Sequence, residues 1–166
     1  MISSVAMWSR YKALPAHERK IAREAARRLT LTWMGLCALG FKRVRESAER
    51  FPRSTRPVTD TSDSNPQLTA SRMIARLVGS ASRHLFFTPN CLVQSLALLE
   101  MLRRRGIAGE LCVGARHESG AFEAHAWVEF AGIVLNDVSG EHHHFTPFES
   151  VAAATETHTP AGTRSR

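Results

Sequence analysis

The sequence predicts one domain of mixed helix and sheet in which the helices come first and the strands follow. Apolar side chains recur at helical spacing up to about residue 105, and apolar and polar residues alternate only after residue 107. A chain of 166 residues is long enough to fold around a single core without disulfide bonds. Its three cysteines, Cys37, Cys91 and Cys112, are too few and too far apart to suggest a disulfide framework.

The chain is basic, with 22 Lys and Arg residues against 15 Asp and Glu residues and a formal net charge of +7. Most of the basic residues are arginines, which bind carboxylates, phosphates and peptide carbonyls. The surplus suits an acidic peptide, a nucleic acid or an anionic membrane and does not choose among them. Because no signal peptide and no apolar stretch of ~20 residues is present, we expect a cytoplasmic protein, with a peripheral membrane helix as the less favoured alternative.

Residues 1–50 are expected to form an N-terminal helical scaffold. Apolar residues one helical turn apart, such as Ala25 and Leu29, share a face from which the arginines point away. Trp8 and Trp33 are the expected core anchors of this region. Glycines in its second half predict a bend or a break.

Three further segments follow this scaffold. Residues 51–69 contain three prolines and many small polar residues, which predicts a linker or a long loop. Residues 70–150 are expected to form the core domain, which begins with a helix from about residue 70 to residue 84. Residues 151–166 are small and polar and are expected to fray.

A buried helix is expected to begin at Cys91 and to end near Arg105. Asn90 is a good N-cap residue, and Gly106 is suited to follow the last turn. Apolar residues surround this helix on nearly all sides, which predicts packing against more than one neighbour. The run Arg103–Arg105 could grip an acidic peptide, but a solvated helix end is the commoner arrangement.

Strands are expected at residues 110–116 and 124–130. The pair Ala131 and Gly132 predicts the turn of a hairpin into a further strand at residues 133–135. In the strand at 124–130, odd-numbered residues would lie on one face and even-numbered residues on the other.

Cys91, His125 and Asp137 together have the composition of a catalytic triad. A thiol attacks as the thiolate, which the partial positive charge at a helix N-terminus favours. An imidazole then accepts and returns the proton, and a carboxylate holds the imidazole in the required orientation. Folding the hairpin about residues 131 and 132 would bring His125 opposite residue 138, within one position of Asp137.

Simpler interpretations exist for residues of these types. A cysteine is usually a small buried hydrophobe, and we expect Cys37 and Cys112 to be structural in this sense. Asp137 could accept backbone hydrogen bonds in a turn. Glu123 and Glu129 share the strand face of the candidate histidine and are rival orienting carboxylates.

Other candidate site residues carry weaker signals. Trp127 could line a substrate site or pack in the core. Gln94 and Asn90 are candidate oxyanion donors, although Asn90 is better explained as a helix cap. His142–His144 could bind a metal ion, but three adjacent residues cannot all face one ion, so a solvated loop is favoured. The sequence holds no phosphate-binding loop, dinucleotide fingerprint or standard zinc motif, and no cofactor is expected.

The blocks CLVQSLALLEMLRRRGIAGELCVGAR and FEAHAWVEFAGIVLND resemble the transglutaminase-like core of the lasso-peptide maturation proteases, the bacterial leader peptidases of lasso-peptide biosynthesis. The resemblance covers roughly residues 70–140. It implies an α+β fold of the papain/transglutaminase type, in which a buried helix led by the nucleophilic cysteine packs on a small antiparallel sheet. The family's Cys, His and Asp fall on Cys91, His125 and Asp137.

The resemblance also implies a function and a set of partners. A cysteine peptidase of this kind removes the leader from a ribosomally made precursor, and a lasso cyclase then closes the freed core N-terminus onto an Asp or Glu side chain. Longer members carry an N-terminal leader-recognition domain of winged-helix type, for which residues 1–50 lack strand signals. We therefore expect a separate leader-binding protein, and neither nucleic acid nor stable membrane insertion.

Other functions stay open on the sequence alone. A transglutaminase-like acyltransferase would keep the thioester but transfer the acyl group to an amine. A non-catalytic scaffold would only present the precursor to a cyclase. A basic nucleic-acid-binding module is poorly supported, because the arginines are spread out and few aromatic residues lie among them.

Overall fold

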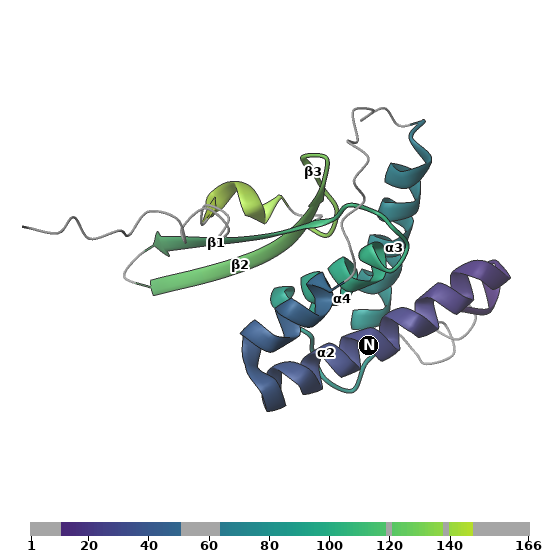
Figure 1. Cartoon of the computed structure of the whole chain (residues 1–166), viewed down its shortest axis with the longest axis horizontal. Coiled ribbons are helices and arrows are strands. Elements are labelled where there is room, and N and C mark those ends of the chain that lie inside the picture. Colours follow the sequence, from purple (N-terminus) through teal and green to yellow (C-terminus); the bar gives the residue numbers. More distant parts are fainter. Residues whose placement is uncertain (1–10, 51–63, 119–120, 138–139, 148–166) are drawn as a thin grey trace, which may run out of the picture.

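Helices precede the sheet in the structure, as the sequence predicts. The computed structural model shown in Figure 1 describes residues 11–50, 64–118, 121–137 and 140–147. In these residues the elements are α2 (Ala16–Glu49), α3 (Pro66–Ser82), α4 (Cys91–Arg103), β1 (Glu110–Glu118), β2 (Ala121–Phe130), β3 (Ile133–Val134), the 3-10 helix η1 (Glu141–His144) and β4 (Thr146–Pro147). The expected α+β class is therefore confirmed.

Some sequence predictions fall outside the described residues. Trp8, most of the predicted linker at 51–69 and the predicted frayed tail at 151–166 are among them. The division of the chain into scaffold, linker and core domain stays a prediction.

α2 is bent at Gly40, where the backbone leaves helical geometry at φ 78° and ψ 171°. A left-handed φ of this kind is readily adopted only by glycine, so the predicted break falls at this residue. In Figure 1 the chain turns back at the far end of α2 and runs toward the sheet.

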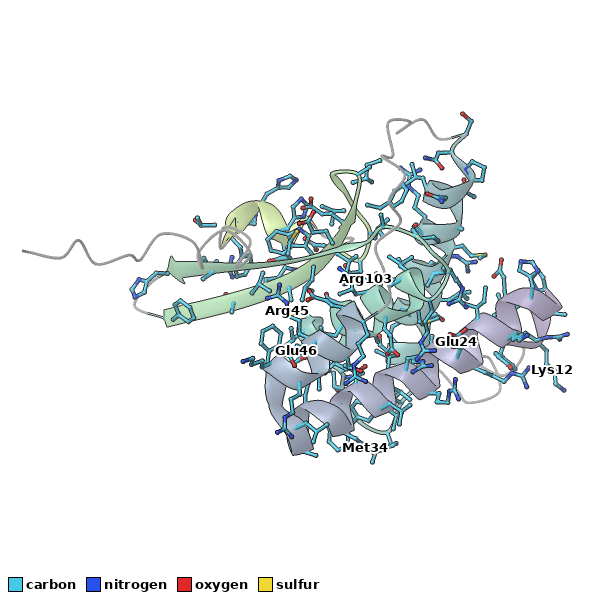
Figure 2. All side chains as sticks on the ribbon, viewed as in Figure 1. Lys12, Glu24, Met34, Arg45, Glu46 and Arg103 are labelled. Atoms are coloured by element: carbon cyan, nitrogen blue, oxygen red, sulfur yellow. The ribbon has the colours of Figure 1, made fainter. Side chains whose placement is uncertain are left out.

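The expectation that Trp33 anchors the core is wrong. Ala25 and Leu29 form the buried face of α2 and are fully buried, whereas Trp33 is 37% exposed. Its ring stacks on Phe87 from the loop before α4, with centroids 4.7 Å apart. Met34 is also exposed and lies on the outer side of α2 in Figure 2. The apolar residues of this segment therefore surround the helix instead of lining one face.

α3 begins at Pro66, four residues before the expected start near residue 70. The side chain of Asn65 accepts a hydrogen bond of 2.8 Å from the backbone N–H of Gln67. Proline at the first helical position loses no helical hydrogen bond. The Asn-Pro pair is thus a helix start, although its composition suggested a linker.

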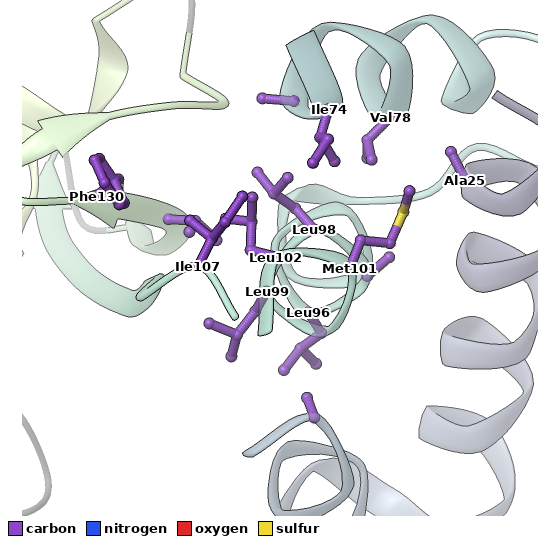
Figure 3. Packing of buried hydrophobic residues seen from close by; sticks show 14 of the residues in the cluster. Ala25, Ile74, Val78, Leu96, Leu98, Leu99, Met101, Leu102, Ile107 and Phe130 are labelled. Atoms are coloured by element: carbon purple, nitrogen blue, oxygen red, sulfur yellow. The ribbon is translucent and has the colours of Figure 1, made fainter. Parts of the chain in front are cut away.

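α4 is the central element of the core. It begins at Cys91, as predicted, and ends at Arg103, two residues before the predicted Arg105. In the close view of Figure 3, α4 lies between α3, α2 and the sheet, and Phe130 approaches it from β2. The buried residues of α4 are Val93, Ser95, Leu96, Ala97, Leu98, Leu99, Met101, Leu102 and Arg103.

Of the three arginines at the end of α4, Arg103 is buried, whereas Arg104 and Arg105 are exposed. Arg103 is only 4% exposed. Arg105 donates a hydrogen bond of 2.5 Å to Glu24 of α2 and one of 2.8 Å to the carbonyl of Met101. The expectation of a solvated end is therefore wrong for Arg103 but holds for Arg104 and for Arg105, which pairs with α2 at the surface.

The sheet has the strand order β3-β2-β1-β4, and all pairs are antiparallel. The predicted turn is present, with Ala131 at φ 50° and Gly132 at φ 77°, which suits a tight hairpin. Val128 and Phe130 are buried in the core cluster with α4. Odd-numbered residues of β2 therefore face away from α4, as the alternation predicts.

The face of the sheet turned away from α4 is covered by η1 and Phe145, which come just before the edge strand β4. A Cβ on Gly114 would lie 2.9 Å from Cβ of Phe145 and 3.1 Å from the Trp127 ring. Only glycine fits at this position of β1. The close approach lets Phe145 and Trp127 pack over the strand.

The Glu24–Arg105 pair makes the fold sensitive to acid. Burial opposes ionisation of Glu24, but the hydrogen bond and charge of Arg105 outweigh it and lower the pKa of this carboxyl below its ordinary 4.5. A lowered folded-state pKa stabilises the fold above the unfolded value, and this contribution is lost as pH falls through the folded value.

We therefore expect Glu24→Gln to lower the free energy of unfolding at pH 7 by about 1 kcal/mol or less. Urea unfolding should show a smaller difference from the wild type near pH 3. Glu46→Gln, at an exposed position of the same helix, should have no such effect. An equal loss for Glu24→Gln at both pH values would contradict the ionic contribution.

Candidate active site

Cys91 is the first residue of α4, and its side chain is partly buried. Asn90 caps the helix as predicted, because its side chain accepts a hydrogen bond of 3.0 Å from the N–H of Val93. The side-chain amide of Gln94 donates to the carbonyl of Pro89 at 2.9 Å and fixes the residues before the helix. The first backbone N–H groups of a helix have no intrahelical acceptor, so they are suited to bind an oxyanion beside Cys91.

A buried hydrogen-bond link ties this end of α4 to β2. Ser95, one helical turn after Cys91, donates from Oγ to the carbonyl of Ala126 at 2.9 Å. Asn136 donates to Ser95 Oγ at 2.9 Å and accepts from the N–H of Val128 at 2.8 Å.

This link ties the first turns of α4 to β2. Ala126 is the neighbour of His125, and one helical turn rises about 5.4 Å. Ala126 faces α4, whereas His125 faces away from it beside Trp127 and Phe145, and among the described residues no hydrogen bond joins Cys91 to His125. Sequence reasoning missed Ser95 and did not single out Asn136. A serine within an apolar helix, four residues after the cysteine, was the available signal.

His125 and Asp137 come together at ion-pair distance, with Nε2 of His125 3.8 Å from Oδ2 of Asp137. The hairpin pairs Glu129 with Val134, and continuing this register would set residue 138 opposite residue 125. β3 ends at Val134, and the Asp137 side chain is only 3% exposed. The 3.8 Å separation exceeds a hydrogen bond, and the buried Nε2 of His125 has no hydrogen-bond partner among the described residues.

The Asp137 carboxylate has a second imidazole neighbour that sequence reasoning missed. The ring Nδ1 of His142 lies 2.7 Å from Oδ2, and the backbone N–H of His142 donates to the same oxygen at 2.5 Å. The expectation of a solvated loop at 142–144 is therefore wrong for His142. The short helix η1 turns this side chain inward while His143 and His144 stay exposed.

Two aromatic rings enclose the imidazole of His125. Trp127 stacks near it with centroids 5.9 Å apart, and Phe145 lies 5.2 Å away. Trp127 is 2% exposed, so it forms the wall beneath His125 instead of a surface open to substrate.

The rival carboxylates have other partners. Glu123 pairs with Arg116 of β1 at 2.6 Å. Glu129 accepts a hydrogen bond of 2.7 Å from the indole N–H of Trp127. Asp137 is therefore the carboxylate that the structure brings to His125, and the catalytic roles of both residues stay predictions.

The two other cysteines differ from each other. Cys37 is exposed on α2, so the expectation that it is buried is wrong. Cys112 on β1 is partly buried, and burial together with the charges of Glu129 and Glu110 raises the pKa of its thiol to about 12. Such a thiol stays protonated and unreactive at neutral pH.

Neither a metal site nor a membrane span is found in the part of the chain that the structure describes. There, no three His, Cys, Asp or Glu side chains group in a way that could hold a metal ion. The described helices also lack the combination of length and apolar character needed to cross a bilayer.

A buried helix led by a cysteine, packed on an antiparallel sheet that carries a His–Asp pair, defines an α+β protein suited to thiol chemistry. The Transglutaminase-like superfamily matches residues 31–150, more than half of the chain, and the chain belongs to this family. Comparison with curated proteins and with solved structures finds no match. Membership indicates cysteine peptidase or acyltransferase activity.

Differences in thiol reactivity provide the first test of this site. Iodoacetamide near pH 7 should alkylate Cys91 faster than the exposed Cys37, and should leave Cys112 nearly unmodified because its thiol remains neutral far above this pH. Peptide mass spectrometry of the labelled protein measures all three. Labelling of Cys112 at the rate of Cys37 would refute the structural assignment of Cys112.

The link through Ser95 provides the second test. Ser95→Ala should lower the free energy of unfolding by about 1–3 kcal/mol, because it removes the buried partner of the Ala126 carbonyl. Urea unfolding measures this loss. Ser80→Ala in α3, at a partly exposed position, is the matched control and should cost far less. Equal losses for the two variants would contradict a specific link between α4 and β2.

Proposed function

We propose that this chain is a cysteine peptidase that removes the leader from a ribosomally synthesised lasso-peptide precursor. The observation that carries the proposal is the His125–Asp137 pair on β2, the strand to which Ser95 ties the helix that begins at Cys91. Family membership supports the cysteine chemistry. The sequence resemblance to lasso leader peptidases supports the choice of substrate.

In the first half of the reaction, His125 takes the thiol proton of Cys91, and the thiolate attacks the carbonyl carbon at the leader–core junction. A C–S bond forms, and the carbonyl oxygen becomes an oxyanion that the N–H of Cys91 can bind. The oxyanion then collapses, the C–N bond breaks, and His125 gives its proton to the leaving amine. The leader stays on Cys91 as a thioester, and the core leaves with a free N-terminus.

In the second half, water attacks the thioester carbonyl while His125 accepts one of its protons. The C–S bond breaks, the leader leaves with a new carboxylate, and the Cys91 thiolate is restored. Asp137 accepts a hydrogen bond from the imidazolium and keeps the ring oriented through both halves. The wall formed by Trp127 and Phe145 shields this face of His125 from bulk water.

The proposed partners are the precursor, a separate leader-binding protein and a lasso cyclase, all acting in the cytoplasm. The described part of the predicted scaffold supports the separate protein, because residues 16–49 are helical and contain no strand. A winged-helix recognition domain needs strands. The leader-binding protein would then supply most of the affinity for the precursor.

An acyltransferase is the second candidate function, and the family match supports it as much as it supports a peptidase. It would follow the same steps as far as the thioester, after which an amine would replace water. Hydrolysis yields separate leader and core, whereas transfer joins the leader to an amine, so the mass of the products separates the two functions.

Cys91→Ala should reduce cleavage of the precursor encoded next to the gene for this chain at least about 1000-fold, because the nucleophile is lost. The assay contains the leader-binding protein and follows free leader and core by mass spectrometry. Cys37→Ser and Cys112→Ser are the matched controls and should keep near wild-type rates. Cleavage by Cys91→Ala would show the nucleophile to be wrong, and no turnover by the wild type would favour the scaffold.

A further inference from the structure

The carboxylate of Asp137 is shared between two imidazoles on different elements. His142 of η1 supplies its ring Nδ1 at 2.7 Å and its backbone N–H at 2.5 Å. His125 of β2 approaches the same oxygen, Oδ2, to 3.8 Å. The triad as predicted from the sequence therefore has a further side chain at its acidic end.

The contacts of His142 fix the position of the carboxylate. The ring Nδ1 and the backbone N–H of His142 both contact Oδ2 of Asp137, and the backbone N–H cannot move unless η1 moves with it. The His142 ring is 17% exposed and is supported by Trp127, 5.9 Å away, and by His143, 3.9 Å away. A buried carboxylate stays charged only when it is paired and hydrogen-bonded, and His142 supplies such bonds.

His142 does not exclude His125 from the carboxylate. A carboxylate accepts about four hydrogen bonds, so Oδ2 and Oδ1 have capacity beyond the two from His142. The unpartnered Nε2 of His125 needs to move about 1 Å to form a hydrogen bond with Oδ2. Such a bond is strongest when His125 is an imidazolium, the state formed once Cys91 has lost its proton.

We propose that His142 is a positioning residue of this site. It donates from Nδ1 to Asp137 and holds the carboxylate charged and turned toward His125. The inference rests on the proposed cysteine chemistry, but not on the identity of the peptide substrate. It also assigns a role to η1, which places His142 against the sheet face that carries His125.

The test measures the rate at which iodoacetamide alkylates Cys91 near pH 7 in the full chain. Mass spectrometry of peptides reports Cys91 and the exposed Cys37 from the same sample, so Cys37 is the internal reference. His142→Ala removes the ring donor, and His142→Asn keeps a side-chain N–H near the position of Nδ1. His144→Ala, at an exposed histidine of the same short helix, is the matched control.

His142→Ala should slow alkylation of Cys91 relative to Cys37 about tenfold, the loss expected for one hydrogen bond to a charged group. His142→Asn should restore most of the rate, and His144→Ala should leave it unchanged. Thermal unfolding of each variant shows whether the fold is kept. Rescue by asparagine separates positioning from a general effect on packing.

Three results would overturn the inference, and they can be told apart from failure of the proposed function. An unchanged or faster rate in His142→Ala, with a fast wild-type Cys91, would refute only the role of His142. A slow rate in both His142→Ala and His142→Asn would make the ring a packing element. A wild-type Cys91 no faster than Cys37 would contradict both the inference and the proposed cysteine chemistry.

Discussion

The hydrogen bond from Ser95 to the carbonyl of Ala126 is the constraint on which the candidate site depends. Cys91 comes from a helix and His125 from a strand 34 positions later, so nothing local in the chain brings them together. Packing of α4 on β2 brings the two elements into contact, but apolar packing alone tolerates small shifts. The buried hydrogen bonds that Ser95 makes with Ala126 and Asn136 do not tolerate such shifts, because a shift would leave polar groups unpaired.

The acidic end of the site is built from the segment after β3. Asp137 follows Asn136 directly, so the residue that completes the helix–strand link also brings the carboxylate to His125. η1 and Phe145 then close over the same face of the sheet. Gly114 permits this closure, since any larger side chain there would meet Phe145. Site and fold therefore use the same few contacts.

The sequence predicts the parts of this structure that depend on local signals. The start of α4 follows from an Asn cap, and the register that brings Asp137 to His125 follows from the turn at Ala131 and Gly132. Contacts between residues far apart in the sequence could not be predicted from local signals. Trp33 resembled a core residue but is exposed, because burial depends on which face of α2 meets α4. His142 was expected in a solvated loop, because it comes within reach of Asp137 only when η1 packs against the sheet.

The proposed chemistry requires the imidazole of His125 to activate the Cys91 thiol. The most direct measurement is the rate at which iodoacetamide alkylates Cys91 near neutral pH in the wild type and in His125→Ala, with Cys37 of the same molecule as the reference. If the imidazole activates the thiol, its removal should lower the relative rate at Cys91 at least about tenfold. An equal relative rate in the two proteins would show that His125 does not act on this sulfur.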